Sequence, residues 1–201
     1  TIKEPVRGIG HFEPLRHYAE VHVLLEPLPL GSGLTFDTNV SMDDLAFNWQ
    51  RLILTHFQEK EHKGVLTGSP ITDIKITLIA GKAHVKHTQG GDFRQAAYRA
   101  IRQGLKKAQS ILLEPYYDFT LTLPANTLSK ALYDLEQKQA DIKIKENIDG
   151  TMTIHGKGPV RTMMNYQKDV IAYTKGLGRY TFQPNGYRPS HDQDQLIESY
   201  G

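Results

Sequence analysis

Hydrophobic and polar residues alternate in three stretches of the first half of the chain, which is the pattern of strands with one buried face. These stretches cover residues 18–25, 34–36 and 71–79, and prolines and glycines separate the first two. Apolar residues recur instead at helical spacing over 42–60, where Trp49 lies on the apolar stripe and is expected in the core, and over about 93–108, where Asp92 is placed to cap the helix. The first half therefore predicts an α+β domain.

The pattern restarts after residue 112. Alternation at 117–123 is followed by a helix from residue 126, a hairpin of strands at 142–146 and 151–155, a helix over 160–173 and a last strand at 180–182. The order strand–helix–strand–strand–helix–strand is the ferredoxin-like (βαββαβ) layout. We expect two domains, 1–112 and 113–201, with a polar tail from about residue 184 that either docks as a short helix on the second domain or frays.

Composition narrows the class of protein. The 201 residues are 39% hydrophobic, contain no cysteine and include no apolar run long enough for a membrane span. The first residues lack the apolar region of a signal peptide, and the absence of an initiator Met suggests an excised fragment or a processed product. We therefore expect a soluble, cytoplasmic protein with no membrane partner.

Charge is distributed unevenly, although the formal net charge is only +2. Between residues 75 and 107 there is one acid, Asp92, against eight cations: Lys75, Lys82, Lys86, Arg94, Arg99, Arg102, Lys106 and Lys107. A local excess of this kind is typical of a surface that meets phosphate, but long cationic side chains also line ordinary solvated helix faces. From charge alone both interpretations stay open.

Motifs for catalysis and metal binding are not found. The sequence has no Gly-x-Ser-x-Gly elbow and no His-Glu-x-x-His pair, and Gly81-Lys82-Ala83 lacks the earlier glycine and the hydroxyl of a phosphate-binding loop. His84 and His87 are three residues apart, a spacing that sends side chains to opposite faces of a strand. We therefore expect no catalytic residue, no metal site and no cofactor in this chain.

Several segments, taken in order, resemble one family. Residues 26–33 read Glu-Pro-Leu-Pro-Leu-Gly-Ser-Gly, residues 64–75 read Gly-Val-Leu-Thr-Gly-Ser-Pro-Ile-Thr-Asp-Ile-Lys, and Asp92-Phe93 opens an Ala-rich helix. Residues 110–115 read Ser-Ile-Leu-Leu-Glu-Pro, and 176–181 read Gly-Leu-Gly-Arg-Tyr-Thr. These segments cover nearly the whole chain and are similar to domains four and five of elongation factor G, with the spelling closest to its relatives, the ribosomal protection proteins.

The resemblance implies a fold and partners. It implies a domain four like ribosomal protein S5, followed by a ferredoxin-like domain five. The partner would be the ribosome, with the tip of domain four in the decoding region of the small subunit and against its rRNA, and domain five near the factor-binding site of the large subunit. GTP and Mg²⁺ would belong to N-terminal GTPase domains of the parent protein, which this chain lacks.

Two loops would form the tip of domain four, at residues 10–17 and 83–91. Cations there would contact phosphate, whereas imidazole and phenyl rings would stack on unpaired bases. The candidate RNA-facing residues are His11, Phe12, Arg16, His17, His84, Lys86, His87 and Gln89. Without the resemblance, both stretches would pass for ordinary polar loops. A second candidate surface is the adjoining basic helix, with Arg94, Arg99, Arg102 and Lys106.

One departure from the family concerns the second loop. Ribosomal protection proteins that evict tetracycline carry a segment resembling Tyr-Ser-Pro-Val, where this chain has His84-Val85-Lys86-His87. A flexible cation thus stands in place of a stiffening proline, which argues against drug eviction and leaves ribosome binding untouched. A tetracycline-resistance protein, a translocase and a paralogue all stay open, as does a free-standing RNA-binding protein that reuses these folds without a GTPase domain.

Overall fold

The computed structural model describes residues 1–15, 17–84 and 86–200. The chain divides into two compact units, residues 1–112 together with 192–201, and residues 113–191. No helix in the described part of the chain is both long and apolar enough to cross a bilayer. Each unit has its own sheet and its own core, so each is described separately.

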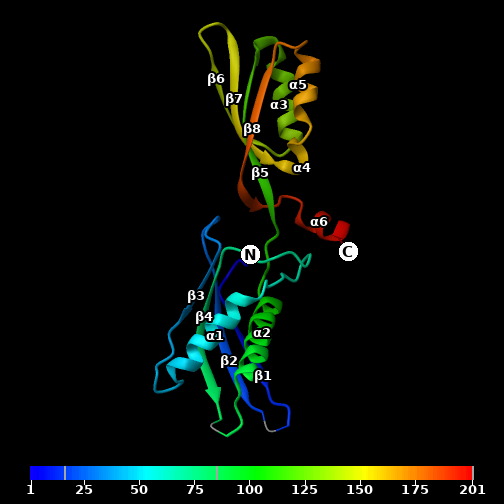
Figure 1. The fold of residues 1–201 in the computed structure, drawn as a ribbon. Helices are drawn as coiled ribbons and strands as arrows, with labels where there is room; N and C mark the ends of the chain where they lie inside the picture. Colours follow the sequence, from blue (N-terminus) through cyan, green and yellow to red (C-terminus); the bar gives the residue numbers. More distant parts are fainter. Residues whose placement is uncertain (16, 85, 201) are drawn as a thin grey trace. The chain divides into compact units, whose positions relative to one another are not determined.

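The first unit is a four-stranded sheet with two helices and a short C-terminal helix (Figure 1). Its sheet order is β1-β2-β4-β3, in which β3 runs parallel to β4 and the other pairs are antiparallel. The elements are β1 (Val6–Phe12), β2 (Ala19–Pro27), β3 (Leu34–Thr38), α1 (Phe47–Glu59), β4 (Ile74–Ala83), α2 (Gly90–Lys107) and α6 (Gln193–Tyr200).

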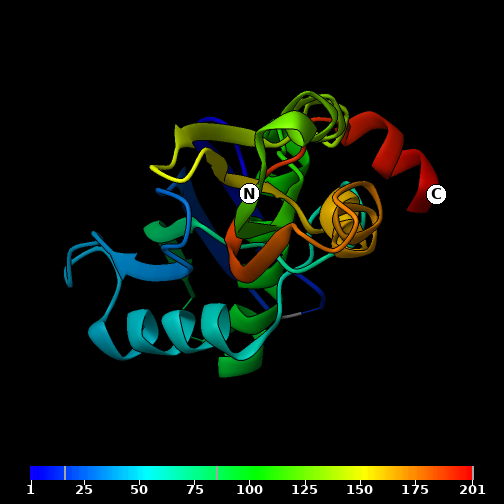
Figure 2. The same ribbon diagram turned by 90° about the horizontal axis from the view of Figure 1, so that it is seen from above.

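The core of the first unit lies between the sheet and helices α1 and α2, which contact each other (Figure 2). Alternation along β2 buries Val21, Val23 and Leu25 completely. The apolar residues of the alternating pattern on β4 are completely buried as well. Phe93 on α2 is fully buried, and Trp49 packs against it with ring centroids 5.1 Å apart. Trp49 is partly buried and packs against the core from its edge.

Strand β1 is not expected from the sequence. Two glycines in seven residues weaken the strand pattern, because glycine has low strand propensity and no side chain to pack. Yet a Cβ on Gly8 would lie 2.1 Å from the carbonyl oxygen of Ala100, and one on Gly10 would lie 2.0 Å from that of Ala96. Glycine is therefore required here, because the backbone of β1 lies directly against α2.

The second unit has the strand–helix order that the sequence predicts. Its sheet order is β6-β7-β5-β8 with every pair antiparallel, which confirms the ferredoxin-like layout and the α+β class. Helices α3 and α5 pack over Phe119, Leu121 and Ile154. The elements are β5 (Leu113–Pro124), η1 (Ala125–Thr127), α3 (Leu128–Gln137), β6 (Asp141–Glu146), β7 (Thr151–Pro159), α4 (Val160–Met163), α5 (Tyr166–Tyr173) and β8 (Arg179–Pro189).

The C-terminal end differs from the sequence-based expectation. The last strand continues to Pro189 instead of ending near residue 182, because β8 stays paired with β5 as far as Leu113. Residues 192–201 are grouped with the first compact unit. The amide of Gln193 explains this: its Oε1 accepts a hydrogen bond from Leu112 N at 2.8 Å, and its Nε2 donates to Ser110 O at 3.4 Å.

Candidate nucleic-acid interface

The two loops singled out in the sequence lie at the same end of the first sheet. The strand β1 ends at Phe12, which pairs with Ala19 at the start of β2, and Ala19 pairs in turn with Ala83 at the end of β4. Among the described residues, 13–15, 17–18, 84 and 86–89 lie beyond this end of the strands. Antiparallel pairing thus brings together two segments that are about 70 residues apart in the sequence.

Thr88 links the two loops. Its hydroxyl Oγ1 donates a hydrogen bond to the carbonyl oxygen of Tyr18 at 2.6 Å and accepts one from the N–H of His84, also at 2.6 Å. The N–H of Tyr18 in turn donates to the carbonyl oxygen of His87 at 3.2 Å. The second loop is therefore closed on itself and attached to the first loop by the same side chain.

A buried carboxylate makes a second link. Asp92 is 4% exposed, and its Oδ2 accepts hydrogen bonds from the N–H of Gln89 at 2.9 Å and from Nδ1 of His17 at 3.1 Å. Gln89 and Asp92 together form a capping box at the start of α2. His17 and Gln89, which the sequence placed among RNA-facing residues, thus position the first loop and cap the helix.

Three described side chains of the second loop are exposed to solvent. His84 and His87 are exposed and stack on each other, with ring centroids 4.5 Å apart and planes inclined by 25°. Lys86 lies between them in sequence, is exposed, and forms no ion pair with any residue that the structure describes. The loop therefore presents a preformed pair of flat rings beside an unpaired cation, which suits contact with bases and phosphate.

His11 and Phe12 lie on β1 and not in the loop, and their side chains point to opposite faces of the sheet. His11 Nδ1 is 3.2 Å from Oε1 of Glu20, a mostly buried carboxylate that also lies within ion-pair distance of His22 and Lys82. Phe12 packs against the core side. Both are therefore at the base of the tip. Arg16 lies outside the described residues.

The helix α2 closes the free edge of β1 with polar side chains spaced four residues apart. Arg99 Nη1 donates to His11 O at 2.8 Å, Gln103 Oε1 accepts from Ile9 N at 2.7 Å, and Lys107 Nζ donates to Arg7 O at 3.0 Å. Four residues along a helix advance about 6 Å, close to the advance of two residues in a strand. The helix therefore satisfies alternate backbone groups of an edge strand.

Most of the basic helix is thus engaged inside the first unit. Besides the contact of Arg99, Arg94 Nε donates to Glu59 Oε1 at 2.9 Å and Arg102 Nη1 donates to Lys63 O at 3.0 Å. Lys106 is exposed, and no partner is found for it among the described residues. Three of the four residues proposed as a second phosphate surface therefore tie α2 to α1, to β1 and to residue 63.

Some residues of the tip have no signal in the sequence. Thr88 holds both loops together, and Leu15 at the turn of the first loop is 93% exposed, yet neither belongs to a recognisable motif. The sequence shows that Arg99, Gln103 and Lys107 are spaced four residues apart. It does not show that these side chains form hydrogen bonds with the backbone of β1. Among the described residues, no three His, Asp or Glu side chains gather in a way that could hold a metal ion.

Comparison with family models gives two adjacent matches. A model described as elongation factor G, domain IV, matches residues 4–109, and one described as elongation factor G C-terminus matches residues 111–197. The two matches cover nearly all of the chain and meet close to the boundary between its two compact units.

Similar proteins carry names from antibiotic resistance. Tetracycline resistance protein TetP of Clostridium perfringens is 33% identical over 171 residues, which are 85% of this chain and 26% of that protein. Tetracycline resistance protein TetO of Campylobacter jejuni is 31% identical over 177 residues, 88% of this chain and 28% of that protein. The chain therefore spans about a quarter of the length of these relatives.

A solved structure shares the fold. A crystal structure of a protein from Thermus thermophilus superposes with a TM-score of 0.82, at 23% identity, over 99% of this chain and 31% of that one. At this level of identity the match supports the fold alone and implies nothing about what the tip loops bind.

Proposed function

Because the chain belongs to the elongation factor G family, as its domain IV and its C-terminal domain, we propose that it binds the ribosome through the tip of the first unit. In this proposal the loops at residues 13–18 and 84–89 enter the decoding region of the small subunit and face its rRNA. The GTPase domains of a parent protein would be its other partners.

The observation that carries the proposal is the exposed second loop, which Thr88 holds against the first. His84 and His87 present stacked rings, and Lys86 presents a cation without an ion-pair partner among the described residues. A loop already held in place loses less conformational entropy when it binds. Flat rings beside a cation can stack on an unpaired base while the ammonium group contacts a neighbouring phosphate.

Binding to isolated small ribosomal subunits tests the proposal. The variant carrying His84→Ala, Lys86→Ala and His87→Ala should bind the subunits more weakly than the unchanged chain, and chemical footprints in the decoding region should disappear. Lys168→Ala is the matched control, because Lys168 is an exposed cation on α5 in the second unit. Its binding and footprint should be unchanged. Equal binding by the tip variant and the unchanged chain would exclude the tip as the rRNA-facing surface.

GTP hydrolysis is assigned, within the same proposal, to the parent's GTPase domains. The sequence of this chain has no phosphate-binding loop, and the chain spans about a quarter of the length of its named relatives. The isolated chain should therefore bind no GTP in a calorimetric titration at micromolar concentrations, whereas measurable binding would contradict this assignment. Action on ribosomes would place the protein in the cytoplasm.

A further inference from the structure

A buried histidine closes the C-terminal end of helix α1. The helix ends at Glu59, and the last four carbonyl groups of a helix have no N–H partner within it. Phe57 carries one of these carbonyl groups. Its oxygen accepts a hydrogen bond at 2.8 Å from Nε2 of His62, a residue that is only 6% exposed. The imidazole of His62 therefore satisfies a carbonyl group that the helix itself leaves open.

His62 also stands at the base of the loop that follows α1. The N–H of Ile71 donates to the carbonyl oxygen of His62 at 2.9 Å, and the N–H of Gly64 donates to Ser69 O at 2.8 Å. Residues 63–70 thus form a closed loop that begins and ends beside His62. The loop contains much of one of the family motifs seen in the sequence, and the function proposed for the tip gives that motif no role.

The position of His62 favours the neutral imidazole. Nε2 carries the hydrogen that Phe57 accepts, so the neutral ring has no hydrogen on Nδ1. No hydrogen bond joins Nδ1 to a residue that the structure describes. A proton added at Nδ1 would place a charge in a buried position without an acceptor from the protein. Burial accordingly holds the pKa of His62 below its usual value of 6.5; the hydrogen bond to Phe57 opposes this effect, and the charge of Lys60 adds to it.

The charged groups around His62 do not offset a proton on it. The titratable and charged side chains on the neighbouring elements are His56, Glu59 and Lys60 on α1, Arg94, Tyr98 and Arg102 on α2, and Glu61 and Lys63 in the connecting segment. Oε1 of Glu59 already accepts hydrogen bonds from side chains of both helices. Within the described ranges, no acid lies at ion-pair distance from His62. Cations outnumber acids in this set, so the surroundings also oppose the protonated form.

Mild acid leaves the rest of the contact between α1 and α2 in place. The carboxyl of Glu59 has a pKa of about 2, chiefly because the hydroxyl of Tyr98 donates to it. Glu59 therefore stays ionised at about pH 5 and keeps its hydrogen bonds to Tyr98 and Arg94 on α2. The effect of a proton on His62 is then confined to the end of α1 and the segment that follows it.

We propose that His62 is a proton-sensitive cap, which holds residues 60–71 closed in its neutral form and lets this segment open when it is protonated, while the rest of the first unit stays folded. Opening also removes the carbonyl oxygen of Lys63, which accepts a hydrogen bond from Nη1 of Arg102 at 3.0 Å. A cation of α2 that the closed loop engages is thereby released to solvent. The segment precedes β4, whose other end, at Ala83, lies beside the tip. The proposal therefore goes beyond the function proposed for the tip.

Acid opens the segment because the closed form binds fewer protons than the open form. The pKa of His62 is lowered in the closed form and is about 6.5 in the open form. The neutral imidazole therefore stabilises the closed form fully above about pH 6.5, and this stability is lost as the pH falls through the lower pKa of the closed form. Between these two values the population of the open segment rises by at most about tenfold for each pH unit.

Nuclear magnetic resonance on the whole, unchanged chain tests the proposal. The imidazole of His62 should titrate with a midpoint below 6.5. Hydrogen-exchange protection factors, corrected for the intrinsic pH dependence of exchange, should fall with pH at the amides of Gly64 and Ile71, by at most about tenfold per unit. The amide of Val23 in the centre of β2 should keep its protection. A midpoint at or above 6.5, or protection at Gly64 and Ile71 that does not change with pH, would overturn the proposal.

His62→Gln separates the proton from the hydrogen bond. The side-chain amide of glutamine can donate to Phe57 O as the imidazole does, but it takes up no proton. In this variant the protection of Gly64 and Ile71 should no longer depend on pH. An acid response that persists in His62→Gln would exclude His62 as its cause. The measurements on the unchanged chain decide the question even where the variant is too unstable to study.

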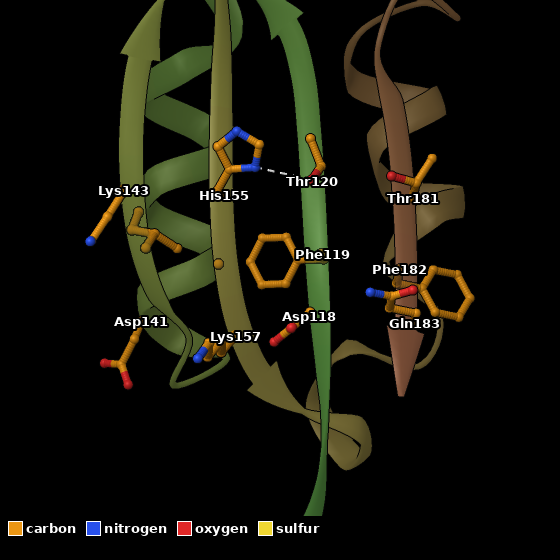
Figure 3. A pocket seen from close by; sticks show the side chains of 12 residues that line it. Asp118, Phe119, Thr120, Asp141, Lys143, His155, Lys157, Thr181, Phe182 and Gln183 are labelled. Carbon is orange, nitrogen blue, oxygen red and sulfur yellow. Dashed lines mark hydrogen bonds between the residues drawn. The ribbon is translucent and has the colours of Figure 1, made fainter. Parts of the chain in front are cut away.

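His155→Gln is the matched control. Figure 3 shows His155 on β7, on the open face of the second sheet, where its Nδ1 lies 3.1 Å from Oγ1 of Thr120. Its imidazole thus shares a hydrogen bond, as that of His62 does, but His155 is exposed. The control should keep the acid response of the unchanged chain at Gly64 and Ile71. Loss of that response in His155→Gln would show that the response does not originate at His62.

Discussion

Gly10 lies so close to Ala96 that a Cβ on the glycine would come within 2.0 Å of the alanine's carbonyl oxygen. The contact brings β1 against α2 just before the first tip loop leaves the sheet. Its neighbour Gly8 makes the same approach to Ala100. The position of the tip therefore depends on two residues that carry no side chain.

Gly10→Ala should lower the free energy of unfolding of the first unit by about 1–3 kcal/mol, the usual cost of overpacking a tight core. Chemical denaturation followed by the fluorescence of Trp49 measures it. Gly91→Ala is the matched control, because a Cβ there meets nothing within 4 Å and the residue lies in the first turn of α2. The control should be neutral or slightly stabilising, and equal effects at both positions would contradict the close approach.

Thr88→Val should loosen the tip while keeping the side-chain shape. The variant loses the hydrogen bond to Tyr18 O and the one from His84 N–H, at a cost of about 1 kcal/mol each or less since water can replace them. Hydrogen exchange should accelerate at residues 17–19 and 84–89. Thr55→Val, which removes a hydroxyl hydrogen-bonded within the exposed face of α1, should leave exchange at the tip unchanged. Unaltered exchange in Thr88→Val would mean that other contacts hold the loops.

Much of the fold is readable from the sequence, because alternation and helical spacing report directly on buried faces. The failures have a common cause in contacts between distant segments. Strand β1 escapes prediction because Gly8 and Gly10 depress local strand propensity, and the need for them appears only when α2 is in place. The sequence also makes the basic helix look like a phosphate-binding surface. It does not show that Arg99 and Arg102 donate hydrogen bonds to backbone oxygens that are far away along the chain.

The candidate site is readable only in outline. The family motifs and the polar composition point to the loops, and His84, Lys86 and His87 are exposed as expected. Sequence cannot separate these groups from His17 and Gln89, whose bonds to Asp92 are structural. Lysines present the same difficulty: Lys138 looks like an exposed helix residue, yet its Nζ donates to Thr162 O at 3.2 Å and lies over the ring of Tyr166. A lysine that looks exposed in the sequence can therefore be part of the packing of the second unit.

Tyr98→Phe should raise the pKa of Glu59. A hydrogen bond from the Tyr98 hydroxyl is the main cause that holds the pKa of this carboxyl down at about 2, with smaller help from His56 and Arg94. A carboxyl whose pKa is lowered on folding contributes stability above its unfolded pKa of about 4.5 and loses it as the pH falls through about 2. A carbon-13 titration of the Glu59 carboxyl should show a midpoint closer to 4.5 in the variant, and an unmoved midpoint would rule out the tyrosine as the cause.

Lys86→Ala and Arg99→Ala should separate the RNA-facing loop from the helix that supports it. Lys86 is an exposed cation with no ion-pair partner among the described residues, so its loss should flatten the log–log salt dependence of ribosome binding by about one unit at most. The free energy of unfolding of the Lys86→Ala variant should change by less than about 0.5 kcal/mol. Arg99 instead donates to His11 O and lies over the ring of Phe12, with 5.3 Å between guanidinium and ring centroid. Its loss should lower stability by about 1 kcal/mol or more, through one hydrogen bond from a charged group and one cation–π contact. Salt titrations and denaturation curves on both variants check the pair. The opposite outcome, in which Arg99→Ala alters the salt slope at unchanged stability and Lys86→Ala does not, would move the phosphate contacts from the loop to the helix.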